Sequence, residues 1–373
     1  MPSPGSPAIS LLTAMRRAQF AFSDSLRRSQ ANALGALGLA PQECPFRIVA
    51  SGKHWRLRDY GGGDCKPPLL IIAAPIKRPY IWDLAPNASA LRFCLANGLR
   101  VFLLEWVAPY AGDAEAGLAE YAGEGIAACV QALTRNCAGQ PVLMGHSLGG
   151  TLAAVYGAID PHSISGLVLL SSPLCFARAS SPFRDSLVSI LPPAIAGTAV
   201  VAGSLLSQAS AMASPKTFLF SRWLDAALSA GDPEALEIHN RVERWALDEV
   251  ALPGRLVKEI VEWLYCEDRF CRGALQIGGR TLGPRSLRVP TLAAVTSADD
   301  VVPASSVAPF IARMAAGCGQ LIEYPGEAGV CLQHVALLAG RRTYVEVWPQ
   351  ILAWIKGLVR GAAAGTQQSA AQQ

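Results

Sequence analysis

The clearest chemical signal in the chain is a short glycine-rich motif around Ser147. Residues 145–150 read Gly-His-Ser-Leu-Gly-Gly, after the apolar run 141–144 and before an Ala-rich stretch with helical spacing. In a Gly-x-Ser-x-Gly turn between strand and helix, the serine takes a strained backbone conformation that exposes its hydroxyl, and the glycines let the two elements approach closely. This context predicts a nucleophile elbow with Ser147 as the nucleophile.

A serine hydroxyl attacks well only when a positioned base removes its proton, and the chain has 5 histidines. His334 is the candidate base, because it lies in the loop 329–335 after the last predicted strand. The other four lie inside the elbow, in an early hairpin, after a helix end and in a predicted insertion: His146, His54, His162 and His239. A structural role for His334 is the alternative that remains open.

The base needs a carboxylate that fixes its tautomer, and two adjacent aspartates follow a predicted strand. Asp299 is favoured because it is followed by three residues and then Pro303. Asp300 then becomes a solvated neighbour or a helix cap, and a reversal of the two roles stays open. The order Ser147, Asp299, His334 along the chain is the order found in α/β-hydrolases.

Acyl chemistry also creates an oxyanion, which requires preorganised backbone donors. The N–H of Leu148, directly after the nucleophile, is one candidate. The second is expected in the loop after the third strand, where Pro75 has no N–H and Ile76 is therefore favoured. Lys77 and Arg78 could assist an anionic substrate, although solvated loop charges are the more common explanation.

Apolar runs that alternate with helical stretches predict the elements that position these residues. The pattern predicts an α/β-hydrolase fold, a mostly parallel eight-stranded sheet with helices on both faces and an inserted cap. The predicted strands are an early hairpin at 46–51 and 54–60, then 68–74, 100–105, 141–144, 166–170, 291–295 and 320–324. The predicted helices are 86–97, 117–137, 147–159, 305–316 and 344–358.

The same pattern divides the chain into an N-terminal helical segment, a core in two parts, a cap inserted after the sixth sheet strand and a disordered tail. Their boundaries are 1–43, 44–173 with 286–360, 174–285 and 361–373. The run 186–215 has no charged residue, and we expect it to line or gate the entrance to Ser147 rather than to bind a membrane surface or span a membrane. The amphipathic N-terminal segment is expected to pack on the main domain.

Composition excludes several classes of function. The net charge is only +4 and no basic stripe is present, so nucleic-acid binding has no support. The 10 cysteines form no Cys-x-x-Cys pair and no cluster at zinc spacing, so we predict no metal site, no cofactor and mostly buried, unreactive thiols. Without an evident signal peptide, the cytoplasm is the expected location.

Several longer segments resemble the polyhydroxyalkanoate synthase family over roughly residues 44–356. The matching segments are 74–86, 98–106, Val242-Glu-Arg-Trp245 with Leu252-Pro-Gly254, 273–279 and the His334 loop. The resemblance implies acyl transfer from hydroxyacyl coenzyme A. The synthases resembled here carry cysteine at the position of Ser147, and a serine ester is the usual intermediate of hydrolysis rather than of polymer growth.

We therefore expect a serine hydrolase or acyltransferase that acts on hydroxyacyl esters or thioesters. A polyhydroxyalkanoate synthase is the alternative enzyme. A non-catalytic protein bound to polymer granules or to a membrane surface is the alternative of a different class. The expected partners are an acyl ester or acyl-coenzyme A and a polyester, with the granule as a second location. Acyl chain length, thioester against oxygen ester, oligomeric state and any partner subunit are left open by the sequence.

Overall fold

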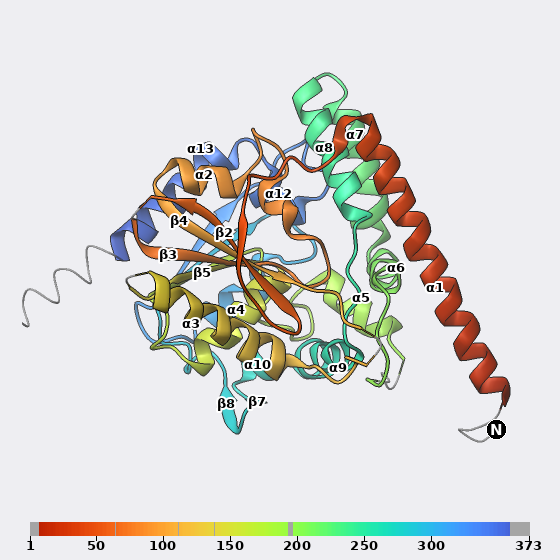
Figure 1. Cartoon of the computed structure of the whole chain (residues 1–373), viewed down its shortest axis with the longest axis horizontal. Coiled ribbons are helices and arrows are strands. Elements are labelled where there is room, and N and C mark those ends of the chain that lie inside the picture. Colours follow the sequence, from red (N-terminus) through yellow and green to blue (C-terminus); the bar gives the residue numbers. More distant parts are fainter. Residues whose placement is uncertain (1–6, 64, 111, 138, 193–196, 359–373) are drawn as a thin grey trace, which may run out of the picture.

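An eight-stranded, mostly parallel sheet forms the centre of the molecule (Figure 1). The computed structural model describes residues 7–63, 65–110, 112–137, 139–192 and 197–358. The strands are β1 (Arg47–Ser51), β2 (Trp55–Gly62), β3 (Cys65–Ile72), β4 (Leu99–Trp106), β5 (Val142–His146), β6 (Gly166–Leu170), β9 (Thr291–Thr296) and β10 (Gly319–Tyr324). Their order is β1-β2-β4-β3-β5-β6-β9-β10, with antiparallel pairs only at β1/β2 and β2/β4. The predicted fold class is confirmed.

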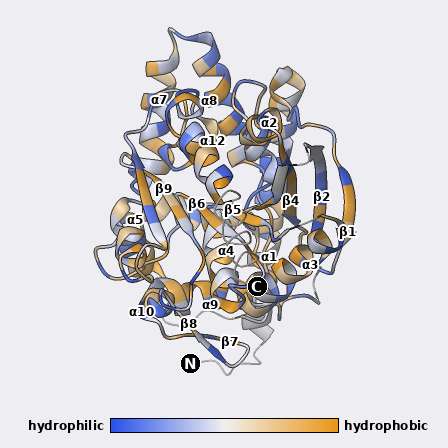
Figure 2. Cartoon of the chain, turned by 90° about the vertical axis from the view of Figure 1, so that its left-hand side faces the viewer, coloured by the Kyte–Doolittle hydropathy of each residue, from blue (hydrophilic) through white to orange (hydrophobic). Residues whose placement is uncertain are grey.

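The central strands are mainly apolar because helices cover both faces of the sheet. Leu70, Leu143 and Leu167 sit in one register across β3, β5 and β6, and each is fully buried. Figure 2 shows the hydrophobic colour gathered on these strands. This rigid centre holds the carboxyl ends of the strands, where the candidate site lies.

Helices pack on both sides of the sheet (Figure 1). On one side lie α2 (Ala90–Ala96) and α13 (Thr343–Glu346), followed by a helix at 348–358; on the other lie α3 (Ile126–Asn136), after the π-helical turn Ala119–Gly125, and α4 (Leu148–Ile159). The predicted helix 305–316 is wrong in extent, since α11 covers only Ala308–Ile311 after the 3-10 turn Ala304–Ser306. Pro309 has no N–H to donate, which disfavours an α-helix that starts as early as residue 305. The end of the helix at Ile311 is not explained by this proline.

Between β6 and β9 the chain leaves the main sheet, and we call residues 174–285 the insertion. Its helices lie mostly along one end of the molecule, and a small hairpin projects beside the last of them (Figure 1). The helices are α5 (Pro182–Ile190), α6 (Gly203–Ala213), α7 (Ser221–Ser229), α8 (Pro233–Ala246), α9 (Gly254–Glu259) and α10 (Arg269–Arg272), with π-helical turns Lys216–Phe220 and Ile260–Cys266. The hairpin pairs β7 (Leu275–Ile277) with β8 (Arg280–Leu282).

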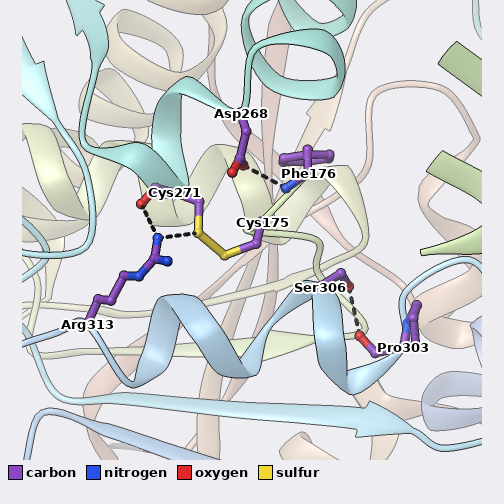
Figure 3. Close-up of a disulfide and its surroundings, with 7 residues drawn as sticks. All are labelled: Cys175, Phe176, Asp268, Cys271, Pro303, Ser306 and Arg313. Carbon is purple, nitrogen blue, oxygen red and sulfur yellow. Dashed lines mark hydrogen bonds between the residues drawn. A yellow bond between two sulfur atoms is a disulfide. The ribbon is translucent and has the colours of Figure 1, made fainter. Parts of the chain in front are cut away.

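A disulfide between Cys175 and Cys271 joins the two ends of the insertion (Figure 3). The amide of Cys175 donates to the carbonyl of Ser306 at 2.8 Å, and Arg313 donates to the carbonyl of Cys271 at 3.2 Å. The bond closes a sequence separation of 96 residues. The two cysteines therefore do more than fill space in the core, which is the role predicted for most of the cysteines.

The N-terminal helix α1 (Pro7–Leu34) runs along one side of the molecule next to α6 (Figure 1). Arg27 forms an ion pair with Glu249 at 2.6 Å, and the amide of Ser204 donates to Asp24 at 2.8 Å. The segment thus packs on the insertion and not, as predicted, on the main domain, because its polar partners lie there. No helix in the described part of the chain is long and apolar enough to cross a membrane. The predicted disordered tail, 361–373, lies outside the described residues.

Candidate active site

Ser147 sits in a sharp turn between β5 and α4. Its φ of 54° and ψ of −134° lie in a region that side chains rarely adopt, as expected for a strained elbow. The glycines at 145 and 150 make the turn possible: a Cβ on Gly145 would lie 2.5 Å from the backbone of Gly150. Local sequence therefore builds the elbow, and the strain holds the hydroxyl above the end of the sheet.

The structure brings His334 and Asp299 to Ser147 in one hydrogen-bonded chain. His334 lies in the 3-10 turn Gln333–Val335, and its Nδ1 is 2.8 Å from Oδ2 of Asp299. Its Nε2 is 2.9 Å from Oγ of Ser147. Because the carboxylate only accepts, Nδ1 carries the proton and Nε2 accepts from the serine hydroxyl. This arrangement can deprotonate Ser147 during attack.

The two adjacent aspartates lie in different environments. Asp299 is 2% exposed, and its other carboxylate oxygen accepts the amide of Val301 at 2.8 Å. Burial by itself would raise the pKa of Asp299, but His334 and the amide hydrogen bonds outweigh it and lower the pKa. Asp300 instead pairs with Lys216 at the surface, at 3.0 Å. The geometry selects Asp299, in the position that the proline spacing predicts.

His146, inside the elbow, contacts the loop of the candidate base, a role that the sequence analysis missed. Its Nε2 lies 2.7 Å from the carbonyl oxygen of His334 and must donate, since a carbonyl only accepts. Burial, and next the nearby His334, lower the pKa of His146 to about 3. A neutral His146 therefore positions the backbone of His334, and no sequence signal marks this contact between residues 188 positions apart.

The candidate oxyanion donors come from two different elements. Leu148 is the first residue of α4, and Ile76 lies in the loop after β3. The carbonyl oxygen of Ile76 accepts a hydrogen bond from the amide of Val250 at 3.1 Å. Their roles as donors remain predictions. Lys77 turns away to the insertion, where its ammonium lies 3.2 Å from Glu249. Burial lowers the pKa of Lys77 to about 8, and the ammonium is already paired with Glu249, so the suggested help to an anionic substrate has no support.

A cavity of about 250 Å³ adjoins the His334–Asp299 pair. Its insertion side is formed by residues 217–228, beyond the uncharged run 186–215 that was expected to line the entrance. Leu224 and Leu228 line it and are 62% and 65% exposed. The wall of the described cavity that the insertion supplies is therefore α7 with the turn before it, and it mixes the two leucines with Thr217, Ser221 and Asp225.

The remaining histidines have other partners. His54 stacks on Tyr121 with ring centroids 5.8 Å apart, and Nδ1 of His239 bonds Asp225 at 2.7 Å. The carbonyl of His162 accepts a hydrogen bond from the Gln140 side chain. Of the candidates weighed in the sequence, His334 is the one that meets Ser147.

Comparison with known proteins supports the fold and the resemblance. A family model described as alpha/beta hydrolase fold matches residues 79–321. The chain is 26% identical over 294 residues to the poly(3-hydroxyalkanoate) polymerase subunit PhaC of Haloferax mediterranei, covering 77% of the chain and 58% of the relative. It is 23% identical over 340 residues to the subunit of the same name from Thiocystis violacea, covering 90% and 94%. The resemblance to polyhydroxyalkanoate synthases is confirmed.

The chain spans about three fifths of some of these relatives, 58% of the Haloferax protein and 60% of one from Haloarcula marismortui. Among solved structures, a candidate lipase from Sulfolobus solfataricus superimposes with a TM-score of 0.53 at 16% identity, covering 84% of this chain and 99% of the other. At that identity, the likeness shows the fold alone.

Proposed function

The chain belongs to the α/β hydrolase fold family, and on that premise we propose that it is a serine-dependent enzyme that transfers or hydrolyses hydroxyacyl groups. The observation that carries the proposal is the hydrogen-bonded chain from Asp299 through His334 to the strained Ser147. The relatives named as poly(3-hydroxyalkanoate) polymerase subunits support a hydroxyacyl ester or thioester as substrate.

In the proposed mechanism, Oγ of Ser147 attacks the acyl carbon while its proton moves to Nε2 of His334. Asp299 stabilises the imidazolium that forms. The N–H groups of Leu148 and Ile76 bind the oxyanion of the tetrahedral intermediate. The intermediate collapses to an acyl-serine when the leaving group takes the proton from His334, and water or an alcohol then resolves the ester.

Polymer synthesis is the second candidate, and the names of the relatives favour it. In that reaction the hydroxyl of another hydroxyacyl unit replaces water as the acceptor. A serine ester keeps less of the thioester's free energy than a cysteine thioester does. The proposal of hydrolysis or simple transfer therefore rests on Ser147.

Incubation with 3-hydroxybutyryl coenzyme A separates the two candidates. Hydrolysis predicts free coenzyme A with soluble 3-hydroxybutyrate, and synthesis predicts insoluble polymer. Ser147→Ala is the matched control for both products. Absence of either product with coenzyme A thioesters and with oxygen esters would instead support a non-catalytic binding protein.

The identity of the nucleophile offers a second test. Ser147→Cys should shift preference from oxygen esters toward thioesters, because the surrounding sequence resembles sites built around cysteine. The measurement is the ratio of kcat/KM for paired 3-hydroxybutyrate esters and coenzyme A thioesters. An unchanged ratio in an active variant would show that the resemblance does not extend to the leaving group.

We further propose that residues 174–285 act as a cap whose α7 region contacts the surface of a polyester granule. Phe220 and Trp223 are 71% and 80% exposed, and they lie close in sequence to Leu224 and Leu228, which line the cavity beside His334. Large exposed apolar patches mark interaction sites. A polymer surface fits because these four exposed apolar side chains form a patch next to the cavity beside His334, where we propose that the acyl group binds.

Sedimentation with poly(3-hydroxybutyrate) granules tests the patch. The double variant Phe220→Gln, Trp223→Gln should lose granule binding, while Tyr110→Gln, a control with 78% exposure elsewhere, should keep it. Equal binding of the two variants would contradict a role for α7. Binding of the wild type to phospholipid vesicles but not to granules would identify a membrane surface instead.

We retain the cytoplasm as the proposed location, and the disulfide tests it, since stable disulfides are rare in reducing compartments. Alkylation of thiols in intact cells, followed by peptide mapping, reports the state of Cys175 and Cys271. Two alkylated cysteines agree with a reducing compartment. A disulfide between Cys175 and Cys271 in freshly lysed cells would argue for an oxidising compartment.

A further inference from the structure

A second polar cluster lies where α7 and α8 meet the loop that carries His334. It consists of Asp225, His239, Glu243 and Cys331, with Arg222 beside them. His239 and Cys331 are 4% and 2% exposed. The proposed acyl chemistry uses none of these side chains, so their burial needs another explanation.

Three of these residues point potential metal-binding atoms at one another. Glu243 Oε1 is 3.7 Å from Nε2 of His239 and 3.3 Å from Sγ of Cys331, and the three ligand atoms all lie within 4.8 Å of one another. Bonds of about 2.0–2.3 Å at a tetrahedral zinc ion separate ligand atoms by roughly 3.3–3.6 Å. Small side-chain movements would therefore complete three of four tetrahedral positions.

Asp225 holds the histidine in the orientation that a metal requires. Its carboxylate accepts from Nδ1 of His239 at 2.7 Å and from the amides of Gly329 and Cys331 at 2.9 and 2.8 Å. The Nδ1 proton on the carboxylate side leaves the lone pair of Nε2 facing Glu243. A carboxylate that orients a ligating histidine through its other nitrogen is the usual outer partner of a zinc ligand.

Charge and access also fit a divalent cation. Nε of Arg222 donates to Oε1 of Glu243 at 2.6 Å, and the Cys331 thiol donates to the same oxygen at 3.3 Å. When the thiol loses its proton, that second lone pair of Oε1 becomes available to a metal ion. When zinc is bound and Cys331 is a thiolate, the positive charges of Zn²⁺ and the Arg222 guanidinium balance the negative charges of Asp225, Glu243 and the thiolate. The cavity of about 250 Å³ that Asp225 and Cys331 line offers an access route.

We propose that His239, Glu243 and Cys331 form a zinc-binding site that ties the insertion to the loop of His334. On binding, the Cys331 thiol loses its proton to solvent and its sulfur bonds the metal, and water takes the fourth position. The pair at 239 and 243 and the cysteine at 331 come from separate segments, which explains why a search for zinc spacing in the sequence predicts no site.

Equilibrium dialysis of the full chain against Zn²⁺, after chelator treatment and without a polyhistidine tag, tests the site. The wild type should retain about one zinc ion per chain. Cys331→Ser and Glu243→Gln should each weaken binding by more than the roughly 10–100-fold that loss of an outer partner costs. Cys266→Ser, which removes an exposed thiol outside the cluster, should bind like the wild type.

Substitution with Co²⁺ provides a readout that needs no variant. The wild type should show thiolate-to-cobalt charge-transfer absorption, and Cys331→Ser should lack it with an unchanged circular dichroism spectrum. No retained zinc in the wild type, or equal binding by Cys331→Ser and Cys266→Ser, would overturn the site. The cluster would then be a hydrogen-bonded ion network only. Neither readout depends on acyl transfer, so the proposed function can fail separately.

Discussion

The part of the chain that the structure describes contains two carboxylate–histidine pairs of nearly the same geometry. Asp299 meets His334 at 2.8 Å, and Asp225 meets His239 at 2.7 Å. In the first pair the free ring nitrogen faces the hydroxyl of Ser147, on a strained turn at the end of the sheet. In the second it faces a carboxylate near a buried thiol. The third group, and not the pair itself, decides which chemistry each histidine can support.

Because only the first pair faces a nucleophile, we expect the largest loss of activity when that nucleophile is removed. Ser147→Ala should reduce acyl transfer by about a million-fold, because a triad without its nucleophile keeps only binding and oxyanion stabilisation. Steady-state hydrolysis of paired esters and thioesters measures it, with Ser189→Ala, an exposed serine of α5, as the control. Activity above a few per cent in a folded Ser147→Ala protein would remove Ser147 from the mechanism.

The next largest effect separates the two adjacent aspartates. Asp299→Asn keeps the shape but removes the charge that stabilises imidazolium, so we expect a loss of about ten-thousand-fold in kcat. Asp300→Asn should change kcat little, because the carboxylate of Asp300 pairs with Lys216 while that of Asp299 meets His334. The reverse ranking would transfer the role to Asp300.

The second pair should respond in stability and not mainly in chemistry. Asp225 is 7% exposed and accepts hydrogen bonds from His239 and from two amides of the His334 loop. Asp225→Asn should therefore lower the free energy of unfolding by roughly 3 kcal/mol. Urea denaturation measures this against Asp300→Asn, a control at a half-buried position. A kcat loss as large as that of Asp299→Asn, with unchanged stability, would mean that the two pairs do not differ as described.

A smaller effect concerns pH. His146 has a folded pKa of about 3 against an ordinary value of 6.5, so between these values the unfolded chain binds a proton that the folded chain does not. The stability contributed by neutral His146 is present above pH 6.5 and is lost as pH falls toward 3. Between pH 7.5 and 5 this group should cost on the order of 2 kcal/mol.

His146→Asn keeps a side-chain N–H donor without the titration, and urea denaturation at the two pH values compares it with the wild type. The variant should lose less stability than the wild type over this range. Identical losses would show that burial does not hold His146 neutral in the folded protein.

The first pair was predictable from sequence because local patterns mark each member. Ser147 directly follows a buried strand and lies between glycines, and Asp299 stands four residues before Pro303 just after another strand. Parallel strands bring such ends to one edge. The centre of the sheet was predictable for the same reason, since β5, β6 and β9 are each a short, mainly apolar run.

The second pair, the disulfide and the packing of α1 were not predictable because they depend on distant contacts between irregular segments. Asp225 and His239 lie on two different helices, and Asp225 accepts from the amide of Cys331, 106 positions away. Cys175 and Cys271 are 96 positions apart. No periodicity links such positions. The extent of the helix near Pro309 failed for a local reason, the missing N–H, which the apolar pattern does not reveal.

Labelling with a fluorophosphonate probe tests most directly whether Ser147 is an activated nucleophile. The wild type should gain one phosphonyl adduct, mapped by mass spectrometry to the peptide that contains Ser147. Labelling should disappear in Ser147→Ala and become much slower in Asp299→Asn, while Asp225→Asn should still label at a temperature where it is folded. A folded wild type that does not label, or that labels at a residue other than Ser147, would contradict the account.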